Sequence, residues 1–326
     1  MKTQAVLIRR HGGPDVLEYT DVEIGDPAQG QVRIRQTAIG LNYADIYQRQ
    51  GEAGPHETRA FPVVLGSQGA GIVEAVGPGV DEVRVGDEVA YIHPGMYARH
   101  VLVPADRTLP LSPGMPADLA AAFLLRGLTA EYLLHRLYAV QPGDAILVHA
   151  AAGGMGEVLC QWAHALGATV IGTVGSPGKV PTAQSHGCHA VIEYRRPDMA
   201  EQVLALTDGK GVKVVYDAVG RDAFLSSLDC LAPRGMAINY GTASGNVQAF
   251  DLQRLHSRSL SVCRPTLRTF IATREELVNA AQRFVRALDA GDVKLAVSRS
   301  YPLAEIRQAH DDLESSRTTG ASILKP

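Results

Sequence analysis

A glycine-rich turn between an apolar strand and a helix is the first feature of this sequence that could support chemistry. The turn, Ala151–Gly156, follows the apolar run Ile146–His149 and precedes the helical stretch Glu157–Leu166. A turn in this position brings backbone N–H groups at a helix N-terminus against a pyrophosphate, and its glycines let the phosphates approach closely. Ala151 replaces the first glycine of the G-x-G-x-x-G pattern, so the motif is a variant, and a purely structural turn is the alternative.

The residues that follow the second expected strand of this region indicate which dinucleotide binds. No Asp or Glu stands at the end of that strand to accept a ribose 2′-hydroxyl. Instead, Ser176 and Lys179 follow in the loop, and Tyr194 lies with Arg195 and Arg196 at the end of the next strand. Hydroxyl and cationic groups of this kind suit a 2′-phosphate. The sequence therefore favours NADPH over NADH, with solvated loop charges as the alternative for Lys179 and Arg195.

Strands and helices must alternate around the turn for it to bind a dinucleotide, and the sequence shows this alternation. Short apolar runs are separated by helical or loop stretches, which predicts a parallel sheet with helices on both faces. The expected strands are Ala145–His149, Thr169–Thr173, Ala190–Glu193, Val212–Asp217 and Gly235–Tyr240.

The segments on either side have a different pattern. The first hundred residues carry short β-branched runs broken by Gly and Pro, which indicates a β-rich domain. Past about Val262 the alternation stops, and a long amphipathic helix is expected over Thr273–Ala290, followed by a second helix over Leu303–Ser315. We expect this tail to return and complete the first domain.

Composition excludes several classes of partner. The 326 residues are 46% hydrophobic, enough for two cores, and the formal net charge is −3 without a sustained Lys/Arg run. Nucleic acid and anionic membranes are therefore poor partners. The N-terminal apolar stretch is too short for a signal peptide or a membrane span, so we expect a cytoplasmic protein. The four cysteines lack the close spacing of a zinc cluster or a redox pair, which predicts free thiols.

Three further stretches, read together with the turn, resemble a known family. They are Gly40–Tyr47, Leu65–Gly71 and Val215–Gly220. The chain resembles the zinc-independent quinone oxidoreductases, the zeta-crystallin-like branch of the medium-chain dehydrogenase/reductase superfamily. The resemblance implies an α/β protein in which a GroES-like β-rich catalytic domain, residues 1–120 and 266–326, encloses a Rossmann domain, residues 121–265. It also implies an active site in the cleft between the domains, and a homodimer.

The resemblance also addresses whether the protein uses zinc. At positions where zinc-dependent relatives carry a Cys and a His-Glu pair, this sequence has Asn42 and Ser67-Gln68. These hydroxyl and amide groups are poor ligands for Zn²⁺, so no metal site is expected. Reduction would then depend on positioning the nicotinamide against an electrophilic substrate and on donors for the developing negative oxygen.

The resemblance supplies most of the candidate site residues. We expect Asn42, Tyr47 and Arg264 to be catalytic, although Asn42 as a helix cap and Tyr47 as a packed helix residue are structural alternatives. The residues expected to bind NADPH are Asn42, Tyr47, Thr129, Gly153, Gly154, Met155, Gly156, Thr173, Ser176, Lys179, Tyr194, Val219, Tyr240, Gly241, Thr242, Arg264 and Arg317.

The expected activity is NADPH-dependent reduction of quinones. Reduction of the carbon–carbon double bond of an enone or alkenal is an enzymatic alternative, because it needs the same oxygen-stabilising donors. An alternative of another class is a non-catalytic NADPH-binding protein of the crystallin-like or RNA-binding kind, against which the near-neutral charge and the polar cleft residues argue.

Overall fold

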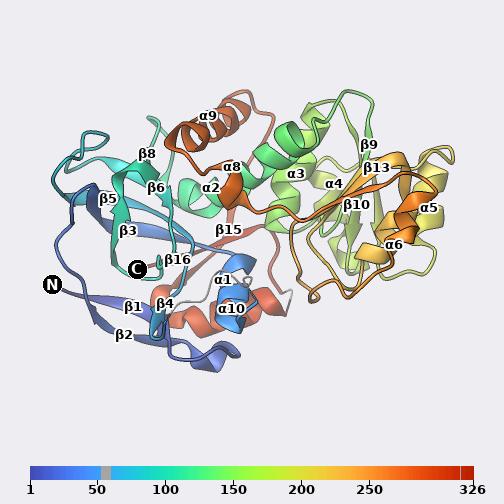
Figure 1. The fold of residues 1–326 in the computed structure, drawn as a ribbon. Coiled ribbons are helices and arrows are strands. Elements are labelled where there is room, and N and C mark those ends of the chain that lie inside the picture. The colour runs from blue at the N-terminus through green and yellow to red at the C-terminus, as the bar shows by residue number, and fades with distance from the viewer. Residues whose placement is uncertain (53–59, 316) are drawn as a thin grey trace. The chain divides into compact units, whose positions relative to one another are not determined.

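A computed structural model describes residues 1–52, 60–315 and 317–326 of the chain (Figure 1). The chain forms two compact units. Unit 1 comprises Met1–Leu125 and Leu295–Pro326, and unit 2 comprises Arg126–Lys294. In the described part of the chain, no helix is long and apolar enough to cross a bilayer.

Unit 1 is built on two sheets, counted over its described residues. The smaller has the order β2-β1-β4, and the larger has the order β15-β16-β3-β5-β6-β8, with β7 also paired to β3. The strand bounds are β1 Lys2–Ile8, β2 Glu18–Glu23, β3 Gln31–Leu41, β4 Val63–Val64, β5 Gln68–Val76, β6 Glu88–Ile92, β7 His100–Pro104, β8 Thr108–Pro110, β15 Val297–Pro302 and β16 Ala321–Lys325. The tail thus completes the first sheet system, as expected, because β16 pairs with β3.

Two helices of unit 1 bear on the site. Helix α1 (Tyr43–Gln50) begins directly after β3, and helix α10 (Ile306–Glu314) follows the short 3-10 turn η5 (Leu303–Glu305). The remaining 3-10 turns of this unit are η1 (Pro14–Val16) and η2 (Ala105–Arg107). Burial alternates along β7, which is typical of antiparallel sheets with one face on a core.

Unit 2 contains a parallel sheet whose order, over the described residues, is β11-β10-β9-β12-β13-β14. The strand bounds are β9 Ala145–Val148, β10 Thr169–Val174, β11 Ala190–Glu193, β12 Val212–Asp217, β13 Leu231–Asn239 and β14 Ser261–Cys263. The strand order reverses between β9 and β12, and ligands bind outside the carboxyl ends of the strands at such a switch point. The expected α/β fold and its five strands are confirmed, and β14 adds an edge strand that was not expected.

The helices of unit 2 connect these strands. They are α3 Gly154–Ala165, α4 Val180–Ser185, α5 Met199–Leu206, α6 Phe224–Asp229, α7 Gln253–His256, α8 Leu267–Phe270 and α9 Arg274–Asp289, together with the 3-10 turn η4 (Pro177–Lys179). Helix α2 (Ala117–Glu131) begins in unit 1 and ends in unit 2, where it continues into the π-helix η3 (Tyr132–Leu137).

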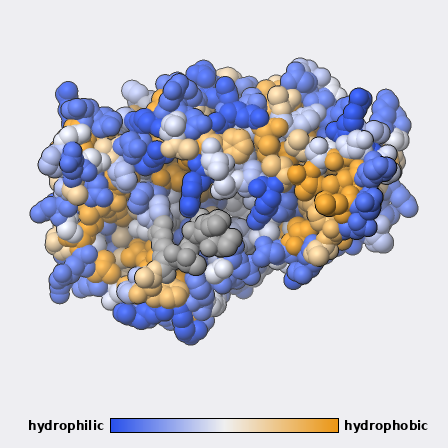
Figure 2. All heavy atoms as spheres, viewed as in Figure 1, coloured by the Kyte–Doolittle hydropathy of each residue, from blue (hydrophilic) through white to orange (hydrophobic). Residues whose placement is uncertain are grey.

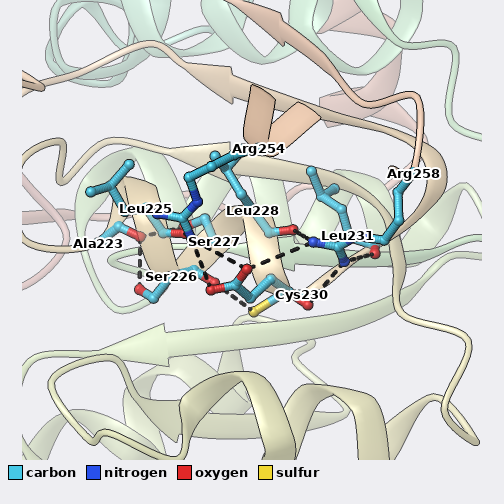
Figure 3. A network of polar contacts seen from close by, with 10 residues as sticks. Ala223, Leu225, Ser226, Ser227, Leu228, Cys230, Leu231, Arg254 and Arg258 are labelled. Atoms are coloured by element: carbon cyan, nitrogen blue, oxygen red, sulfur yellow. Dashed lines mark hydrogen bonds and ion pairs between the residues drawn. The ribbon is translucent and has the colours of Figure 1, made fainter. Parts of the chain in front are cut away.

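Arg254 and Arg258 both contact the end of α6, and Arg258 also contacts the strand that follows it (Figure 3). Arg258 donates to the carbonyls of Leu228 and Leu231, each at 2.8 Å, and Arg254 pairs with the Asp229 carboxylate at 3.2 Å. The last carbonyls of a helix have no partner within the helix, and Arg258 satisfies that of Leu228. The same guanidinium also contacts Leu231, the first residue of β13.

The expected domain boundaries differ from the observed units, mainly on the C-terminal side. Residues 266–294 were expected in the first domain but lie in unit 2, and the first boundary falls at residue 125 instead of 120. The reason is the packing of α9. Its Phe284 ring lies 5.9 Å from the Trp162 ring of α3, and a Cβ added at Gly127 would come within 2.2 Å of it. The amphipathic pattern predicted a buried face but not the surface that covers it.

Gly156 lets α3 pack closely on the end of β9. A Cβ at this position would lie 2.4 Å from the carbonyl oxygen of Ala151 and 2.6 Å from that of Ala150. Backbone atoms cannot move aside as a flexible side chain can, so only glycine fits without displacing the turn.

We expect Gly156→Ala to lower the free energy of unfolding by about 3 kcal/mol, because its methyl group overpacks against backbone. Gly178→Ala is the matched control, since a Cβ there meets nothing within 4 Å. Urea denaturation followed by circular dichroism measures both. Equal midpoints for the two variants would contradict the packing described.

Candidate functional site

The glycine-rich turn lies at the carboxyl end of β9, at the switch point of the sheet. Gly153 is the N-cap of α3 in an extended conformation, and its N–H donates to the carbonyl of Ala150 at 2.9 Å. Ala150 itself has a φ of 54°, in the left-handed region that glycine favours. The expected residues Gly153, Gly154, Met155 and Gly156 therefore form the first turn of α3, where the helix dipole favours an anion.

The side chain of His149, directly before the turn, makes hydrogen bonds to two neighbouring elements. Its Nδ1 lies 2.7 Å from the Thr173 hydroxyl and its Nε2 lies 2.7 Å from the Ser227 hydroxyl. Burial lowers the pKa of His149, and the nearby Asp217 carboxylate acts in the opposite direction. Thr173 was expected to contact the cofactor, but its side chain is fully buried and bonded to His149. The Thr173 side chain thus takes part in the buried hydrogen bonds of His149, next to the turn.

Asp217, at the end of β12, organises the second half of the strand edge. Its buried carboxylate accepts hydrogen bonds from the N–H of Val219 at 2.7 Å, from the N–H of Gly220 at 3.1 Å and from the Asn239 amide at 2.9 Å. The backbone N–H of Tyr240 donates to the Asp217 carbonyl at 2.9 Å. Four expected residues are therefore brought to one place, and they are Val219, Tyr240, Gly241 and Thr242.

Asp217 itself had no role assigned from the sequence. A signal was present, because an Asp two residues before the N–H groups of a turn is the pattern of an Asx turn. The position of Asn239 on the neighbouring strand gave no such signal.

Ser176, Lys179 and Tyr194 follow the carboxyl ends of β10 and β11. The backbone N–H of Tyr194 donates to the carbonyl of Val174 at 3.2 Å, and a Cβ at Gly175 would lie 3.4 Å from the Tyr194 ring. Ser176 is the N-cap of η4, and Lys179 is its last residue. Partial burial lowers the pKa of Lys179, and a bound anion would oppose that shift.

The arginines expected near this group differ in their contacts. Arg195 lies over the Tyr194 ring, with its guanidinium carbon 5.4 Å from the centroid. Arg196 instead pairs with Asp198 at 3.1 Å. Arg195 therefore lies beside Tyr194, whereas the guanidinium of Arg196 is paired with Asp198.

The other expected residues of unit 2 lie on different elements. Arg264 follows β14, and its guanidinium donates to the carbonyl of Asn239 at 2.9 Å, which brings it to the same strand edge. Thr129 is buried in the last part of α2.

In unit 1 the N-terminus of α1 carries the expected catalytic residues. Asn42 occupies the N-cap, and its backbone N–H donates to the Asp45 carboxylate at 2.9 Å. Its amide nitrogen Nδ2 is buried and has no hydrogen-bond partner among the described residues. The structural alternative, a helix cap, is thus correct for its position but leaves the amide donor unexplained. Tyr47 is half-buried, with its ring 5.9 Å from that of Tyr43.

Ser67 and Gln68, which were not expected to bind a metal, have protein partners. The Ser67 hydroxyl donates to Asp45 at 2.5 Å, and the Gln68 side-chain oxygen accepts from the Leu125 N–H at 2.6 Å. Over residues 1–52, 60–315 and 317–326, no three His, Cys, Asp or Glu side chains are grouped as a metal site requires. These neutral groups fit hydrogen bonding better than metal ligation.

Arg317, expected as a cofactor contact, pairs with Asp312 of α10 at 3.0 Å. That carboxylate also accepts hydrogen bonds from Arg299 at 2.9 Å and from Tyr301 at 2.8 Å. The Arg317 guanidinium is thus part of a local cluster in unit 1.

Comparison with known proteins agrees with both units. Residues 28–113 match the family model described as alcohol dehydrogenase GroES-like domain, and residues 154–286 match the one described as zinc-binding dehydrogenase. The chain is 44% identical to a quinone oxidoreductase of Pseudomonas aeruginosa over 97% of each chain. It is 42% identical to a 2-haloacrylate reductase of Burkholderia over 99% of this chain and 98% of that one.

Structural comparison gives the same result over the whole chain. The crystal structure of Escherichia coli quinone oxidoreductase complexed with NADPH matches with a TM-score of 0.95 and 41% identity, and it covers 99% of this chain and 100% of that one. The resemblance inferred from the sequence motifs is confirmed. With its GroES-like and Rossmann-like parts and relatives well above 30% identity over nearly the full length, the chain belongs to the quinone oxidoreductases of the medium-chain dehydrogenase/reductase superfamily.

Proposed function

We propose that this protein reduces quinones with NADPH and without zinc. The observation that carries the proposal is the joint placement of the glycine-rich turn and the Ser176, Lys179 and Tyr194 group at one edge of a parallel sheet. Relatives at 42–44% identity include quinone oxidoreductases, and the similar structure from Escherichia coli holds NADPH. Family membership and site chemistry therefore support the same activity.

The residues present fit this cofactor. The first turn of α3 would hold the pyrophosphate, because Gly156 keeps the backbone close and the helix N-terminus favours negative charge. Ser176, Lys179 and Tyr194 would hold the 2′-phosphate, with a hydroxyl and an ammonium as donors. Val219 and the segment 240–242 would line the rest of the cofactor. When bound, NADPH supplies a hydride to the acceptor.

The residues of unit 1 would act on the acceptor. The Asn42 amide nitrogen, which has no hydrogen-bond partner in the described ranges, would donate to the oxygen on which negative charge develops. Tyr47 is a further proposed donor of this unit, and Arg264 of unit 2 is another. Because Ser67 and Gln68 are neutral and bonded to protein groups, we propose that no zinc assists and that the acceptor must already be electrophilic.

Reduction of an activated carbon–carbon double bond is the second candidate. The 42% identity to a 2-haloacrylate reductase favours it, because that name describes a conjugated acid as substrate. Hydride addition to the β-carbon of such a substrate also places negative charge on an oxygen. The same donors would therefore serve both reactions.

We further propose a cytoplasmic homodimer. Among the residues that the structure describes, the edge strand β14 pairs on one side only, and a second copy would extend the sheet there. Apolar side chains gather on the visible face of unit 2 (Figure 2), and the large exposed ones of this unit include Leu252 (69% exposed) and Val262 (37%). The four free thiols suit a reducing compartment, which cell fractionation tests.

We expect Lys179→Ala to raise the Kd for NADPH about tenfold or more and to leave the Kd for NADH unchanged, because only NADPH carries the 2′-phosphate. Lys210→Ala is the matched control, since Lys210 is an exposed lysine of the same unit. Fluorescence titration with both cofactors measures the effect. A similar loss for NADH would refute the assignment of Lys179.

We expect faster turnover with a panel of small quinones than with a panel of alkenals. We also expect Asn42→Ser to lower kcat with a quinone by about a hundredfold. Serine keeps the helix cap but removes the amide donor. Asn246→Ser, at an exposed asparagine of unit 2, should keep wild-type rates. Higher rates with alkenals would favour the second candidate function, and unchanged kcat in Asn42→Ser would exclude its role as donor.

Native mass spectrometry can test the dimer and the absence of zinc together. We expect twice the mass of the 34.8 kDa chain without bound zinc, and a monomer for Val262→Glu, because a charge would be buried at the joined edge. Val85→Glu is the control, since Val85 is 61% exposed in unit 1. Stoichiometric zinc would overturn the metal-free proposal, and a monomeric wild-type protein would overturn the dimer.

A further inference from the structure

A chain of hydrogen-bonded, buried polar side chains begins at the Asn42 backbone, and the proposed chemistry does not use it. Its centre is the Asp45 carboxylate on α1, which is fully buried. It accepts hydrogen bonds from the Asn42 N–H at 2.9 Å, from the Ser67 hydroxyl at 2.5 Å and from the Tyr97 hydroxyl at 2.9 Å. Three donors around one carboxylate stabilise its charge and fix its orientation.

The chain continues from Tyr97 to the C-terminal helix α10. The Nε2 of His310 lies 3.2 Å from the Tyr97 hydroxyl, and its Nδ1 lies 3.1 Å from a guanidinium nitrogen of Arg49. A guanidinium can only donate, so Nδ1 is the acceptor. Burial, together with the charge of Arg49, lowers the pKa of His310 to about 3. The ring is therefore neutral at pH 7, and its one proton is on Nε2, which donates to Tyr97.

Arg49 ends this chain of hydrogen bonds, and its charge is paired with Glu314. This guanidinium is fully buried, and it donates to the Gly12 carbonyl at 3.0 Å and to Glu314 at 2.7 Å. The negative Asp45 and the positive Arg49 are thus joined through two neutral side chains with hydrogen bonds of defined direction. A buried network whose members all have partners holds a single arrangement.

We propose that Asp45 is a positioning residue for the reduction and that Tyr97, His310 and Arg49 set its orientation. Asp45 holds the first turn of α1 through the Asn42 backbone and thereby aims the Asn42 amide. The unpartnered, buried Nδ2 is the second observation, because a donor left without a protein acceptor in the described ranges is available to an oxygen of the bound ligands. The inference rests on the proposed function, since it assigns that amide to the acceptor.

Two buried tyrosines of unit 1 provide a matched test. Tyr97→Phe removes one hydrogen bond from Asp45 and one from His310, whereas Tyr91→Phe removes one from Gln36, which bonds to the carbonyls of Met96 and Ala98. We expect both variants to lose thermal stability, with the larger loss in Tyr97→Phe. Only Tyr97→Phe should lower kcat with a quinone, by about tenfold, with the NADPH Kd unchanged. Equal kcat values for the two variants would overturn the inference.

Variants at His310 separate positioning from packing. His310→Gln offers an amide N–H to Tyr97 and an acceptor oxygen to Arg49. These replace the donor and the acceptor of the neutral ring, so the variant should keep kcat near the wild-type value. His310→Leu keeps an apolar side chain but breaks both bonds, and it should match Tyr97→Phe. A His310→Gln variant as slow as His310→Leu would contradict the network.

A second readout does not depend on the acceptor. The ¹⁵N-labelled Asn42 side-chain resonance, assigned by its loss in Asn42→Ser, should shift in Tyr97→Phe but not in Tyr91→Phe. If the wild-type enzyme reduces no quinone, the proposed function fails, and this resonance alone decides the inference. An unshifted resonance in Tyr97→Phe would then refute it.

Discussion

The hydrogen bonds of one buried carboxylate, Asp217, hold together the edge of unit 2 on which the cofactor proposal depends. Its oxygens accept N–H groups of the turn after β12 and the amide of Asn239 on β13. His149 makes an equivalent connection, from β9 to Thr173 on β10 and to Ser227 on α6. Removing one partner from such buried groups leaves an unsatisfied polar atom, which costs more than the bond contributed. The strand edge is therefore set before any ligand binds, which lowers the ordering cost of binding.

Unit 1 contains two buried, oppositely charged side chains, Asp45 and Arg49, on the helix that the proposed site residue Asn42 caps. The buried Asp45 carboxylate accepts hydrogen bonds from the Asn42 N–H and from the Ser67 and Tyr97 hydroxyls. The buried Arg49 guanidinium is paired with Glu314 and bonded to His310. A buried charge is tolerated when it is hydrogen-bonded or paired, and each of these two groups has such partners.

Local patterns predicted the elements well, and long-range contacts were beyond them. The strand–turn–helix at Ala151–Gly156 was recognisable because periodicity and glycine placement are local properties. Strand β14 was missed because it has three residues, two of them exposed. The sequence grouped residues 266–294 with the first domain, whereas they lie in unit 2, because an apolar face does not specify what it packs against.

The site residues were predictable to a similar extent. Asn42 and Tyr47 came from the family resemblance, whereas their supporting network did not, because Arg49 and His310 are separated by 261 positions. Thr173 shows a further limit, since nothing in the sequence indicated that its hydroxyl bonds to the buried His149. Propensity and spacing thus identify which segments carry the chemistry, and only the folded chain identifies what holds them.

The participation of α10 and β16 in unit 1 has a consequence for biosynthesis. Residues 126–294 form unit 2 as one continuous stretch, so the ribosome completes that unit before Leu295 is added. One partner of β3 is β16, and the ring bonded to Tyr97 is on α10, so unit 1 cannot close until residues 295–326 have been made. During synthesis the nascent chain therefore carries a complete nucleotide-binding unit while the first-made strands still lack their final neighbour.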